Sequence, residues 1–407
     1  RRWIPEAVTF TAPNAQVAHS WVQKLQERIR STRPRKLLVF INPYGGKGKA
    51  SRIYTKKVFP LFELAGIETE VIETTHANHA RDFIVEQDLQ KYDGVVCVGG
   101  DGMFSELLHG LVTRTQRDSG VCEEDESSLL TPCKLRIGII PAGSTDCVCF
   151  ATVGINDPVT SALHIIIGDT QPLDVCASYH ASKLQRFSVS LIGYGFFGDV
   201  LKFSENLRWM GPARYDVSGL KMFFRNKAYR GTVEFQEADD LNSSPRDNTR
   251  CPMNCNWKKI SGSFRAINIT GMSSACPKSL DGLSPSAHLA DGTADLILVH
   301  KCGLFQFLKH LNRHTNGEDQ FALPHVEVHR VRAMRFMPDE EDEKEIVRRR
   351  KGTFSSMCGG DDLHTSTWNC DGEILDCAQL RFFAHSINER KLTLVLHSSC
   401  IFSSVKK

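Results

Sequence analysis

The spacing of apolar residues changes about 170 residues into the chain, and the first part favours alternating strands and helices. Its strands are short apolar runs bounded by glycine or polar residues, at Lys36–Ile41, Glu68–Glu73, Gly94–Val98 and Leu135–Ile140. Between them, residues 51–64 and 103–112 carry apolar side chains at helical spacing. Alternating strands and helices predict a parallel sheet between two helical layers. We therefore expect residues 36–170 to form a three-layer α/β domain.

The second part of the chain has shorter, alternating patterns that are rich in β-forming residues. Six such runs are separated by polar turns, at Arg186–Gly193, Arg230–Phe235, Ser263–Ile269, Ala294–His300, Val326–Phe336 and Glu373–Phe383. They predict a mostly antiparallel β-sandwich. We expect this domain to cover residues 171–390, and we assign no structure to a tail at 391–407.

Residues 1–35 fit neither domain. Ala7–Phe10 suggests the end of a strand, and Asn14–Arg30 predicts a helix. The helix has an apolar stripe that should pack against other residues, formed by Val17, Trp21, Leu25 and Ile29. We interpret residues 1–35 as a partial N-terminal segment, because too few residues precede the helix to form a domain.

Composition narrows the function classes. The 407 residues are 41% hydrophobic and 24% charged with a net charge of +3, which describes a globular protein and gives no indication of nucleic-acid binding. The 14 cysteines are scattered, and several lie in apolar runs, as buried free thiols in a reducing compartment do. No run reaches the roughly 18 apolar residues that a membrane span needs. We expect a cytoplasmic protein whose contact with membranes is peripheral.

The first run leads directly into a glycine-rich turn, Asn42-Pro43-Tyr44-Gly45-Gly46-Lys47-Gly48. Backbone N–H groups between a strand and a helix can bind an anion, and Lys47 adds positive charge. The glycine spacing differs from that of a Walker loop. The turn predicts a phosphate site, and the alternative is a turn that needs glycine only for its backbone shape.

A second turn, Gly99-Gly100-Asp101-Gly102, follows the strand at Gly94–Val98 and opens the next helix. Its glycines would allow the backbone to approach a phosphate group. Asp101 could accept a proton from an attacking hydroxyl group or organise Mg²⁺. Glu106, about one helical turn later, would lie near the same place. The alternative is that Asp101 only caps a helix.

A third turn, Pro141–Asp146, has small and hydroxyl-bearing residues suited to a nucleotide. The order and spacing of Asn-Pro-x-Gly-Gly-Lys-Gly, Gly-Gly-Asp-Gly and Pro-Ala-Gly-Ser resembles the catalytic domain of the diacylglycerol, sphingosine and ceramide kinase family. The nucleotide domain of that family is similar to those of phosphofructokinases and NAD kinases. The third turn reads Pro-Ala-Gly-Ser-Thr-Asp, as in the ceramide-phosphorylating members, where sphingosine kinases have Gly-Asn at the end.

The resemblance implies a lipid kinase that uses ATP and Mg²⁺, with Asp101 as the general base. The residues that it implies at the nucleotide are Asn42, Pro43, Tyr44, Gly45, Gly46, Lys47, Thr74, Thr75, His76, Ala77, Asn78, Glu106, Gly143, Ser144, Thr145, Arg208, Arg214, Asp371, Gly372 and Glu373. Those that it implies at the lipid are Gly99, Gly100, Asp101, Gly102, Asp199 and Leu201. It assigns no ligands to the metal ion.

Gly195–Asp216 is the best candidate for lipid and phosphate contacts, because it combines aromatic side chains with Arg208 and Arg214. Guanidinium groups bind phosphate oxygens well, although salt bridges on a helix are the alternative. Sphingosine kinases carry an aspartate where this chain has Leu201, two residues after Asp199. An apolar residue leaves an ammonium group unpaired but tolerates a neutral amide, so we predict ceramide as the lipid.

Three further segments carry weaker indications. Asp371-Gly372-Glu373 resembles a motif of the same family whose carboxylates reach the nucleotide, but Asp-Gly before a strand is also typical of a hairpin turn. Cys251 and Cys255 are too few ligands for a zinc site. Residues 338–362 contain an acidic run, a basic run and then a stretch rich in Ser, Gly and Asp. This composition predicts a disordered insertion.

Partners are predicted from two helical segments. Leu304–His314 is a basic amphipathic stretch of the kind that calmodulin and anionic membranes recognise, and a core-packing helix with one basic face is the alternative. The family resemblance adds a calcium and calmodulin response and a ceramide-bearing membrane at the Golgi or plasma membrane. Residues 1–35 resemble the end of a pleckstrin homology domain, with a plain linker helix as the alternative.

Together with the family resemblance, these patterns predict ATP-dependent phosphorylation of the primary hydroxyl group of ceramide to ceramide 1-phosphate. The alternatives are a sphingosine or diacylglycerol kinase, an NAD kinase, and a lipid-binding protein with an inactive kinase fold. The aromatic segment Gly195–Asp216 opposes an NAD kinase. The intact motifs Gly99–Gly102 and Asp371–Glu373 oppose an inactive fold.

Overall fold

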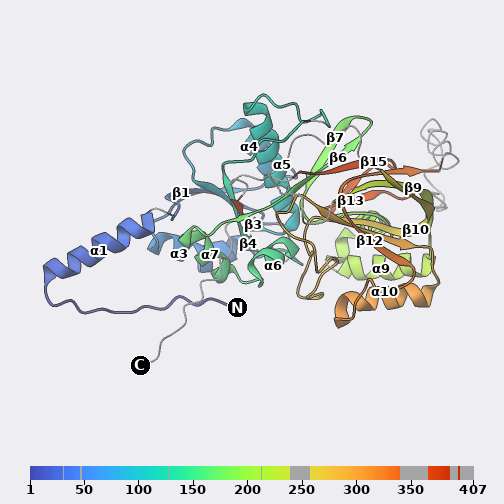
Figure 1. Ribbon diagram of the computed structural model, residues 1–407. Coiled ribbons are helices and arrows are strands. Elements are labelled where there is room, and N and C mark those ends of the chain that lie inside the picture. The colour runs from blue at the N-terminus through green and yellow to red at the C-terminus, as the bar shows by residue number, and fades with distance from the viewer. Residues whose placement is uncertain are drawn as a thin grey trace. The chain divides into compact units, whose positions relative to one another are not determined.

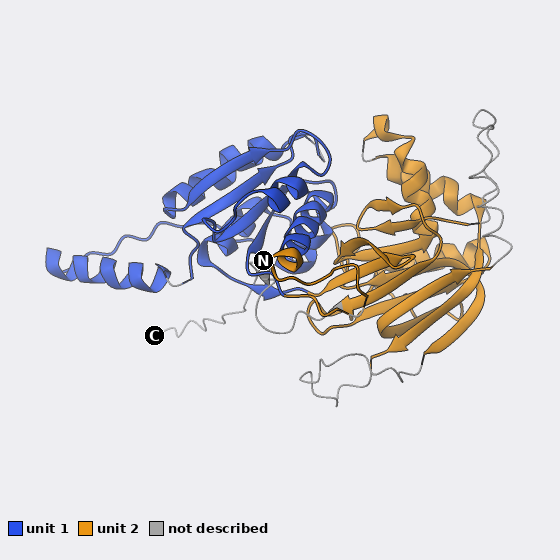
Figure 2. Cartoon of the chain, turned by 90° about the horizontal axis from the view of Figure 1, so that it is seen from above, with its two compact units in different colours: residues 1–114, 132–173, 389–407 blue, residues 115–131, 174–388 orange. Residues whose placement is uncertain are grey.

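The computed structural model describes residues 1–30, 32–45, 48–126, 128–211, 213–238, 257–339, 365–385 and 393–394. The chain divides into two compact units (Figure 2). Unit 1 comprises residues 1–114, 132–173 and 389–407, and unit 2 comprises residues 115–131 and 174–388. The predictions for Gly46, Lys47, Cys251 and Cys255, and for most of 338–362, lie outside the described residues.

Unit 1 is built on a mainly parallel sheet in the order β2-β1-β3-β4-β16-β5. Its strands are β1 (Lys36–Ile41), β2 (Glu68–Glu73), β3 (Gly94–Gly99), β4 (Arg136–Pro141), β5 (Gln171–Pro172) and β16 (Thr393–Leu394). β1 pairs in parallel with β2 and β3, and β3 pairs in parallel with β4. The carboxyl ends of the four predicted strands therefore meet at one edge of the sheet.

Helices cover both faces of this sheet (Figure 1). The helices before residue 174 are α1 (Ala15–Arg30), α2 (Ala50–Ile53), η1 (Tyr54–Val58), α3 (Phe59–Leu64), α4 (His79–Glu86), α5 (Asp101–Asp118), α6 (Cys147–Val153) and α7 (Pro158–Ile167). On one face, Val39 of β1 packs in a cluster with Tyr54 and Phe62. On the other, the ring of Phe40 contacts that of Phe83 in α4 at 5.6 Å. The predicted three-layer α/β fold is confirmed.

The N-terminal helix departs from its prediction. α1 begins after Asn14, whose side-chain oxygen accepts a hydrogen bond from the backbone of Val17 at 2.9 Å. None of its side chains is buried, and Trp21 and Leu25 are 44% and 61% exposed. The apolar stripe therefore lacks the packing that we expected among the described residues.

The residues before α1 are held by a few long-range contacts and contain no strand, so the strand end expected at Ala7–Phe10 is wrong. The backbone N–H of Trp3 donates to Oγ1 of Thr160 at 3.0 Å, and the Trp3 ring lies 4.0 Å from that of His164. Both partners belong to α7, so the start of the chain lies against this helix of unit 1.

Unit 2 contains an antiparallel sheet of ten strands. They are β6 (Val175–His180), β7 (Lys183–Ser188), β8 (Leu191–Gly195), β9 (Tyr229–Glu237), β10 (Lys258–Thr270), β11 (Ala294–His300), β12 (Val326–Pro338), β13 (Trp368–Cys370), β14 (Glu373–Leu375) and β15 (Leu380–His385). The order is β14-β13-β8-β10-β11-β12-β15-β6-β7, and β9 pairs with both β10 and β12. Each of these two long strands pairs with β9 along one half and with β11 along the other, so the sheet folds into two layers.

An aromatic core fills the space between the layers. Trp368 is fully buried, and its ring lies 4.9 Å from that of Tyr194 and 6.0 Å from that of Phe336. These residues come from β13, β8 and β12 and belong to one apolar cluster. The predicted C-terminal antiparallel β-sandwich is confirmed.

The remaining helices of unit 2 are α8 (Phe196–Glu205), η2 (Arg208–Met210), α9 (Ala213–Arg225) and α10 (Leu304–Asn316). α10 confirms the helix predicted at Leu304–His314, and it buries Phe307 against Val299 of β11. Among the described residues, no single helix is long and apolar enough to cross a bilayer, whereas α6 and α7 meet that test as a pair bent by 57°.

Candidate functional site

Three turns of unit 1 meet where β1, β3 and β4 end. The backbone N–H of Asn42 donates to the carbonyl oxygen of Val98 at 3.2 Å, and that of Ala142 donates to Gly99 at 3.0 Å. These bonds continue the pairing of the strands into the turns. The three predicted phosphate turns are therefore neighbours in space, in the order first, second, third.

Asn42 shapes the first turn from within. Its side-chain oxygen accepts hydrogen bonds from the backbone N–H groups of Tyr44 at 3.1 Å and Gly45 at 2.8 Å. A Cβ atom on Gly45 would lie 2.8 Å from the Asn42 amide nitrogen, so a larger residue would push against the side chain that shapes the turn. Pro43 stands between them, and the Tyr44 side chain is 80% exposed.

The second and third turns approach each other backbone to backbone. A Cβ atom on Gly143 would lie 2.6 Å from Cα of Gly100, and one on Gly100 would lie 3.1 Å from Cα of Gly143. No side chain fits between the two segments. This close approach explains both glycines structurally and brings Ser144 and Thr145, which are exposed, beside the start of α5.

Gly102 differs from these glycines. It is exposed, and a Cβ atom there would have no neighbour within 4 Å apart from its own helix backbone and adjacent residues. The fold itself therefore does not require glycine at this position. A bound molecule that uses the space beside the first turn of α5 would require it.

Asp101 joins two helices. It is the first residue of α5, and its two carboxylate oxygens accept hydrogen bonds from the backbone N–H groups of Cys147 at 3.0 Å and Val148 at 2.9 Å. Those N–H groups open α6, and a carboxylate at a helix N-terminus is stabilised by the helix dipole. Asp101 therefore caps a helix, which was the alternative to a catalytic role. The capped helix is α6, whereas Asp101 itself belongs to α5.

The buried thiol of Cys97 in β3 is influenced by the charges of three carboxylates. Burial raises the pKa of Cys97 well above its usual value, and the negative charges of Asp146, Asp101 and Glu106 raise it further. Asp146 was not among the site residues predicted from the sequence. It is buried at a left-handed φ of 54°, and it accepts a hydrogen bond from the Gly143 backbone at 2.9 Å. Its position just before a helix was the available signal.

The segment after β2 lies next to the first turn. The backbone N–H of Thr74 donates to the carbonyl oxygen of Ile41 at 2.9 Å, and the Thr74 side chain is buried. Thr75, His76 and Ala77 are exposed. Asn78 adopts a left-handed φ of 65° immediately before α4. His76 stacks on His79 at 4.8 Å.

In unit 2, Asp199 of α8 is held by two hydroxyl groups. Its carboxylate accepts hydrogen bonds from Oγ of Ser366 at 2.6 Å and from the hydroxyl group of Tyr229. Burial raises the pKa of Asp199, and these two hydrogen bonds oppose that rise. Leu201 is 4% exposed. Its apolar character is therefore explained by its burial in unit 2.

Arg208 and Arg214 are brought together by one carboxylate. Glu205 accepts hydrogen bonds from Arg208, including one from Nε at 2.6 Å, and forms an ion pair with Arg214 Nη1 at 3.4 Å. Arg214 also donates to the hydroxyl group of Tyr215 at 2.6 Å. The salt bridges that were the alternative to phosphate binding are therefore observed. Because both guanidinium groups pair with the one carboxylate of Glu205, the cluster keeps a net positive charge.

Asp371 and Gly372 form the two-residue turn between β13 and β14. Both have positive φ, 48° and 90°, as the favoured hairpin turns require. The Asp371 carboxylate accepts hydrogen bonds from the backbone N–H groups of residues 189–191, at 2.8, 3.1 and 2.8 Å. Burial raises its pKa, and these bonds oppose the rise. Glu373 binds the guanidinium group of Arg186 through both oxygens.

The predicted site residues thus form one group in unit 1 and three groups in unit 2. The unit 1 group contains the glycine turns, Thr74 and the carboxylates of Asp101 and Glu106. In each group of unit 2, polar side chains form hydrogen bonds with other residues of the same unit. Among the described residues, no three His, Cys, Asp or Glu side chains are arranged to hold a metal ion.

Two protein families match the chain in succession. Residues 36–178 match the diacylglycerol kinase catalytic domain, and residues 189–388 match the ceramide kinase C-terminal domain. The boundary between the two matches, 179–188, lies close to the division between the units at 173 and 174. Both the order and the position of the matches therefore follow the structure.

Individual relatives agree with the families. The chain is 47% identical to ceramide kinase of Homo sapiens, over 95% of this chain and 81% of that protein. It is 34% identical to ceramide kinase 1 of Caenorhabditis elegans, over 91% of this chain and 67% of that protein. A solved structure of a putative diacylglycerol kinase from Bacillus anthracis str. Sterne, 14% identical, has a TM-score of 0.59 over 90% of this chain and 98% of its own, which supports the fold alone.

Proposed function

Because the chain belongs to the ceramide kinase family, we propose that it transfers the γ-phosphoryl group of ATP to the primary hydroxyl group of ceramide. The products are ceramide 1-phosphate and ADP. The structural observation that supports this most is the convergence of three turns at the carboxyl ends of β1, β3 and β4, with open space at Gly102. Ligands of parallel α/β sheets bind at this edge.

Asp101 is the general base in this proposal. Its carboxylate takes the proton of the ceramide hydroxyl group while that oxygen forms a bond to the γ-phosphorus. The bond from the γ-phosphorus to the bridging oxygen breaks, and its electron pair leaves with ADP. The hydrogen bonds from Cys147 and Val148 keep both carboxylate oxygens in a fixed orientation for this transfer.

The phosphates of ATP are proposed to lie against the turns of unit 1. The first turn of α5 offers backbone N–H groups and a helix dipole, and Gly102 leaves room for a phosphate group. We retain as proposed nucleotide contacts the predicted residues of the other turns, Asn42–Gly45, Thr74–Asn78 and Gly143–Thr145. Mg²⁺, when bound, would neutralise phosphate charge. Asp101 and Glu106 carry the carboxylate oxygens that it prefers, although among the described residues no three such side chains are arranged as a metal site.

Unit 2 is proposed to contribute both to ATP and to the lipid. Arg208 and Arg214 are proposed phosphate contacts, because their cluster with Glu205 keeps a net positive charge. Asp371–Glu373 remains a proposed nucleotide contact on the family resemblance, alongside its role in the hairpin. Asp199 and Leu201 remain the proposed border of the ceramide headgroup.

The regulatory partners are also proposals. α10 is the candidate calmodulin segment, but Phe307 and His310 of this helix are buried, so calmodulin could bind it only after the helix leaves unit 2. A calcium response would then act through calmodulin. We further propose peripheral association with a membrane of the Golgi or cell surface from the cytoplasmic side, because the lipid that accepts the phosphate resides in a bilayer.

The proposal is tested by incubating the chain with labelled ATP and Mg²⁺ and mixed micelles of ceramide, sphingosine or diacylglycerol in parallel. We expect label mainly in ceramide. Label mainly in sphingosine or diacylglycerol would retain the kinase and overturn the substrate. Absence of label in every lipid, with ATP binding intact, would favour the lipid-binding alternative.

A further inference from the structure

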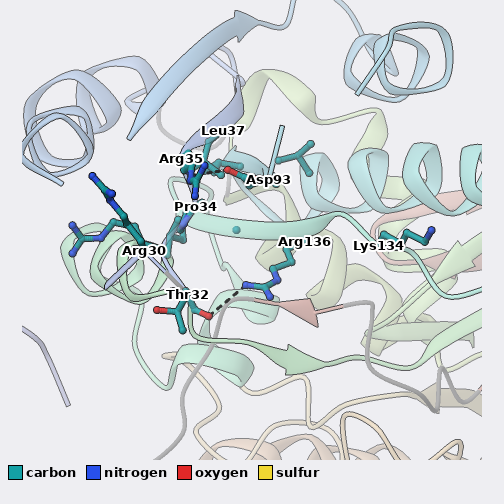
Figure 3. Close-up of a pocket in the computed structure, with 15 residues that line it drawn as sticks. Arg30, Thr32, Pro34, Arg35, Leu37, Asp93, Lys134 and Arg136 are labelled. Atoms are coloured by element: carbon teal, nitrogen blue, oxygen red, sulfur yellow. Dashed lines mark hydrogen bonds between the residues drawn. The ribbon is translucent and has the colours of Figure 1, made fainter. Parts of the chain in front are cut away.

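A cavity of about 420 Å³ opens in unit 1 at the amino ends of the strands, the edge of the sheet opposite the glycine turns (Figure 3). The residues that line it include Leu37 near the start of β1, the first residues of β3 and β4, and the last residue of α1. Its volume falls within the range of roughly 300–1,000 Å³ that is typical of small-molecule sites. It is separate from the proposed ATP site, because the two lie at opposite ends of the same strands.

Two glycines and the partly buried Arg33 shape the cavity. Gly94 and Gly138 lie on its floor, where a Cβ atom would meet Arg136 O at 3.1 Å or Ile165 Cδ1 at 2.7 Å. Arg33 donates to the carbonyl oxygens of Ile166 at 3.2 Å and Ala65 at 3.1 Å, at the ends of α7 and α3. These bonds anchor the wall that follows α1.

The lining carries an excess of positive charge. Its cationic residues are Arg30, Arg33, Arg35, Lys134 and Arg136, and its acidic residue is Asp93. The Asp93 carboxylate is occupied by the backbone N–H groups of Arg35 at 2.6 Å and Lys36 at 3.0 Å. None of the five cations forms an ion pair with a carboxylate among the residues that the structure describes. Arg33 and Arg136 bind carbonyl oxygens, which leaves Arg30, Arg35 and Lys134 as exposed cations.

We propose that this cavity binds a phosphate-bearing anion, at a site distinct from that of ATP. The cations come from two separate segments, residues 30–35 and 134–136, that line the same cavity. Arginine binds phosphate oxygens in pairs. Like-charged side chains that gather without acidic partners repel one another, and a bound anion relieves that repulsion. The site would therefore bind multiply charged anions more tightly than singly charged ones.

The surroundings favour a lipid headgroup as the source of the anion. α1 ends at Arg30 in the cavity rim, and the same helix exposes Trp21, Leu25 and Ile29. A helix with exposed aromatic and aliphatic residues beside cations is suited to the interface of an anionic membrane. A soluble phosphate compound would use the same cations without α1.

The decisive experiment compares two double variants with equal loss of charge. Arg35→Gln/Lys134→Gln removes two exposed cations of the cavity, and Lys56→Gln/Lys57→Gln removes two exposed cations of η1 elsewhere on unit 1. Binding of inositol hexakisphosphate is measured by calorimetry with a non-hydrolysable ATP analogue present at saturation. A second measurement is sedimentation with vesicles of phosphatidylcholine containing a phosphoinositide.

We expect the cavity variant to weaken binding of inositol hexakisphosphate by roughly tenfold or more, and the η1 variant to change it by less than about twofold. Vesicle binding lost in the cavity variant alone would support the site with a lipid source, and unchanged vesicle binding would support it with a soluble source. Equal affinity of both variants for the hexakisphosphate, or complete displacement of this probe by the ATP analogue, would overturn the proposal. Unchanged unfolding temperatures would show that both variants are folded.

Discussion

At the scale of single residues, the glycines of the proposed ATP site fall into two kinds. Gly100 and Gly143 are needed by the protein itself, because their backbones touch. Gly102 is not needed by the fold, since a methyl group there would point into open space. Asp101 cannot be sorted in this way, because its hydrogen bonds to α6 are those of a structural cap. Only its effect on turnover can distinguish a general base from a cap.

The two kinds of glycine predict opposite behaviour on substitution by alanine. Gly143→Ala should destabilise the chain by roughly 1–3 kcal/mol or more, because the methyl group collides with Gly100. Gly102→Ala lies in a helix and should leave stability unchanged or raise it by up to about 1 kcal/mol. The same methyl group should raise KM for ATP by about 5- to 150-fold through steric conflict. Urea unfolding and steady-state kinetics measure both effects, and a normal KM for Gly102→Ala would place the phosphates elsewhere.

Asp101→Asn should lower kcat by about 10²- to 10⁴-fold, the usual contribution of a general base. Asparagine keeps one of the two acceptor oxygens that cap α6 and turns an NH2 group toward the other N–H, so the loss of stability should be about 1–3 kcal/mol. The measurement is kcat at saturating ATP and ceramide, with urea unfolding of the same samples.

Asp118→Asn serves as the control for that variant, because Asp118 is the exposed last residue of the same helix. It should leave kcat and stability unchanged. Turnover of Asp101→Asn equal to that of the control would reduce Asp101 to a structural cap and remove it from the chemistry.

At the scale of elements, the spacing of apolar residues predicted helices and strands correctly where the apolar side chains are buried. The runs at Lys36–Ile41 and Gly94–Val98 are strands because nearly every side chain in them is buried. The stripe at Val17–Ile29 has the same helical periodicity but no partner among the described residues, and sequence cannot distinguish these two situations. The hairpin turn at Asp371–Gly372 was only the alternative in the sequence prediction. It could be recognised because its backbone requirements are local, whereas its hydrogen bonds to residues 189–191 are not.

α10 gives a prediction for pH. His310 is buried and its Nδ1 has no hydrogen-bond partner among the described residues, and burial together with the charge of His314 lowers its pKa to about 3. Between pH 6.5 and about 4 the unfolded chain therefore binds a proton at this residue that the folded chain does not. Stability should be fully present above pH 6.5 and should fall on acidification by about 1.4 kcal/mol per pH unit from this group.

Urea unfolding between pH 7 and pH 4.5 tests this slope. His310→Leu should lower the slope by about 1.4 kcal/mol per pH unit, because leucine has no proton to gain. A slope from His314, whose pKa burial lowers to about 4, should remain. His288→Leu, at an exposed position, should leave it as in the parent chain. An undiminished slope in His310→Leu would mean that other groups cause the acid sensitivity.

At the scale of the whole molecule, two features follow from contacts that no local pattern encodes. Residues 115–131 belong to unit 2, where the carbonyl oxygen of Glu123 accepts a hydrogen bond from Tyr179 and Glu126 pairs with Arg381. β16 pairs with β4 and β5 of unit 1 although it follows unit 2 in the chain. The fold class could be read from periodicity, but these two returns of the chain join residues more than 50 positions apart in sequence and could not.

Hydrogen exchange can test which of the proposed residues bind ATP. The proposed contacts are the three turns of unit 1 and, on the family resemblance, Arg208 and Arg214 of unit 2. A non-hydrolysable ATP analogue at about 100 times its Kd should slow exchange at bound segments by up to about 100-fold. We expect this protection at residues 42–45, 99–104 and 142–148, and also at 208–216. Protection confined to the three turns would limit the nucleotide contacts to unit 1 and would remove the two arginines from the chemistry, while the glycine turns would keep their role.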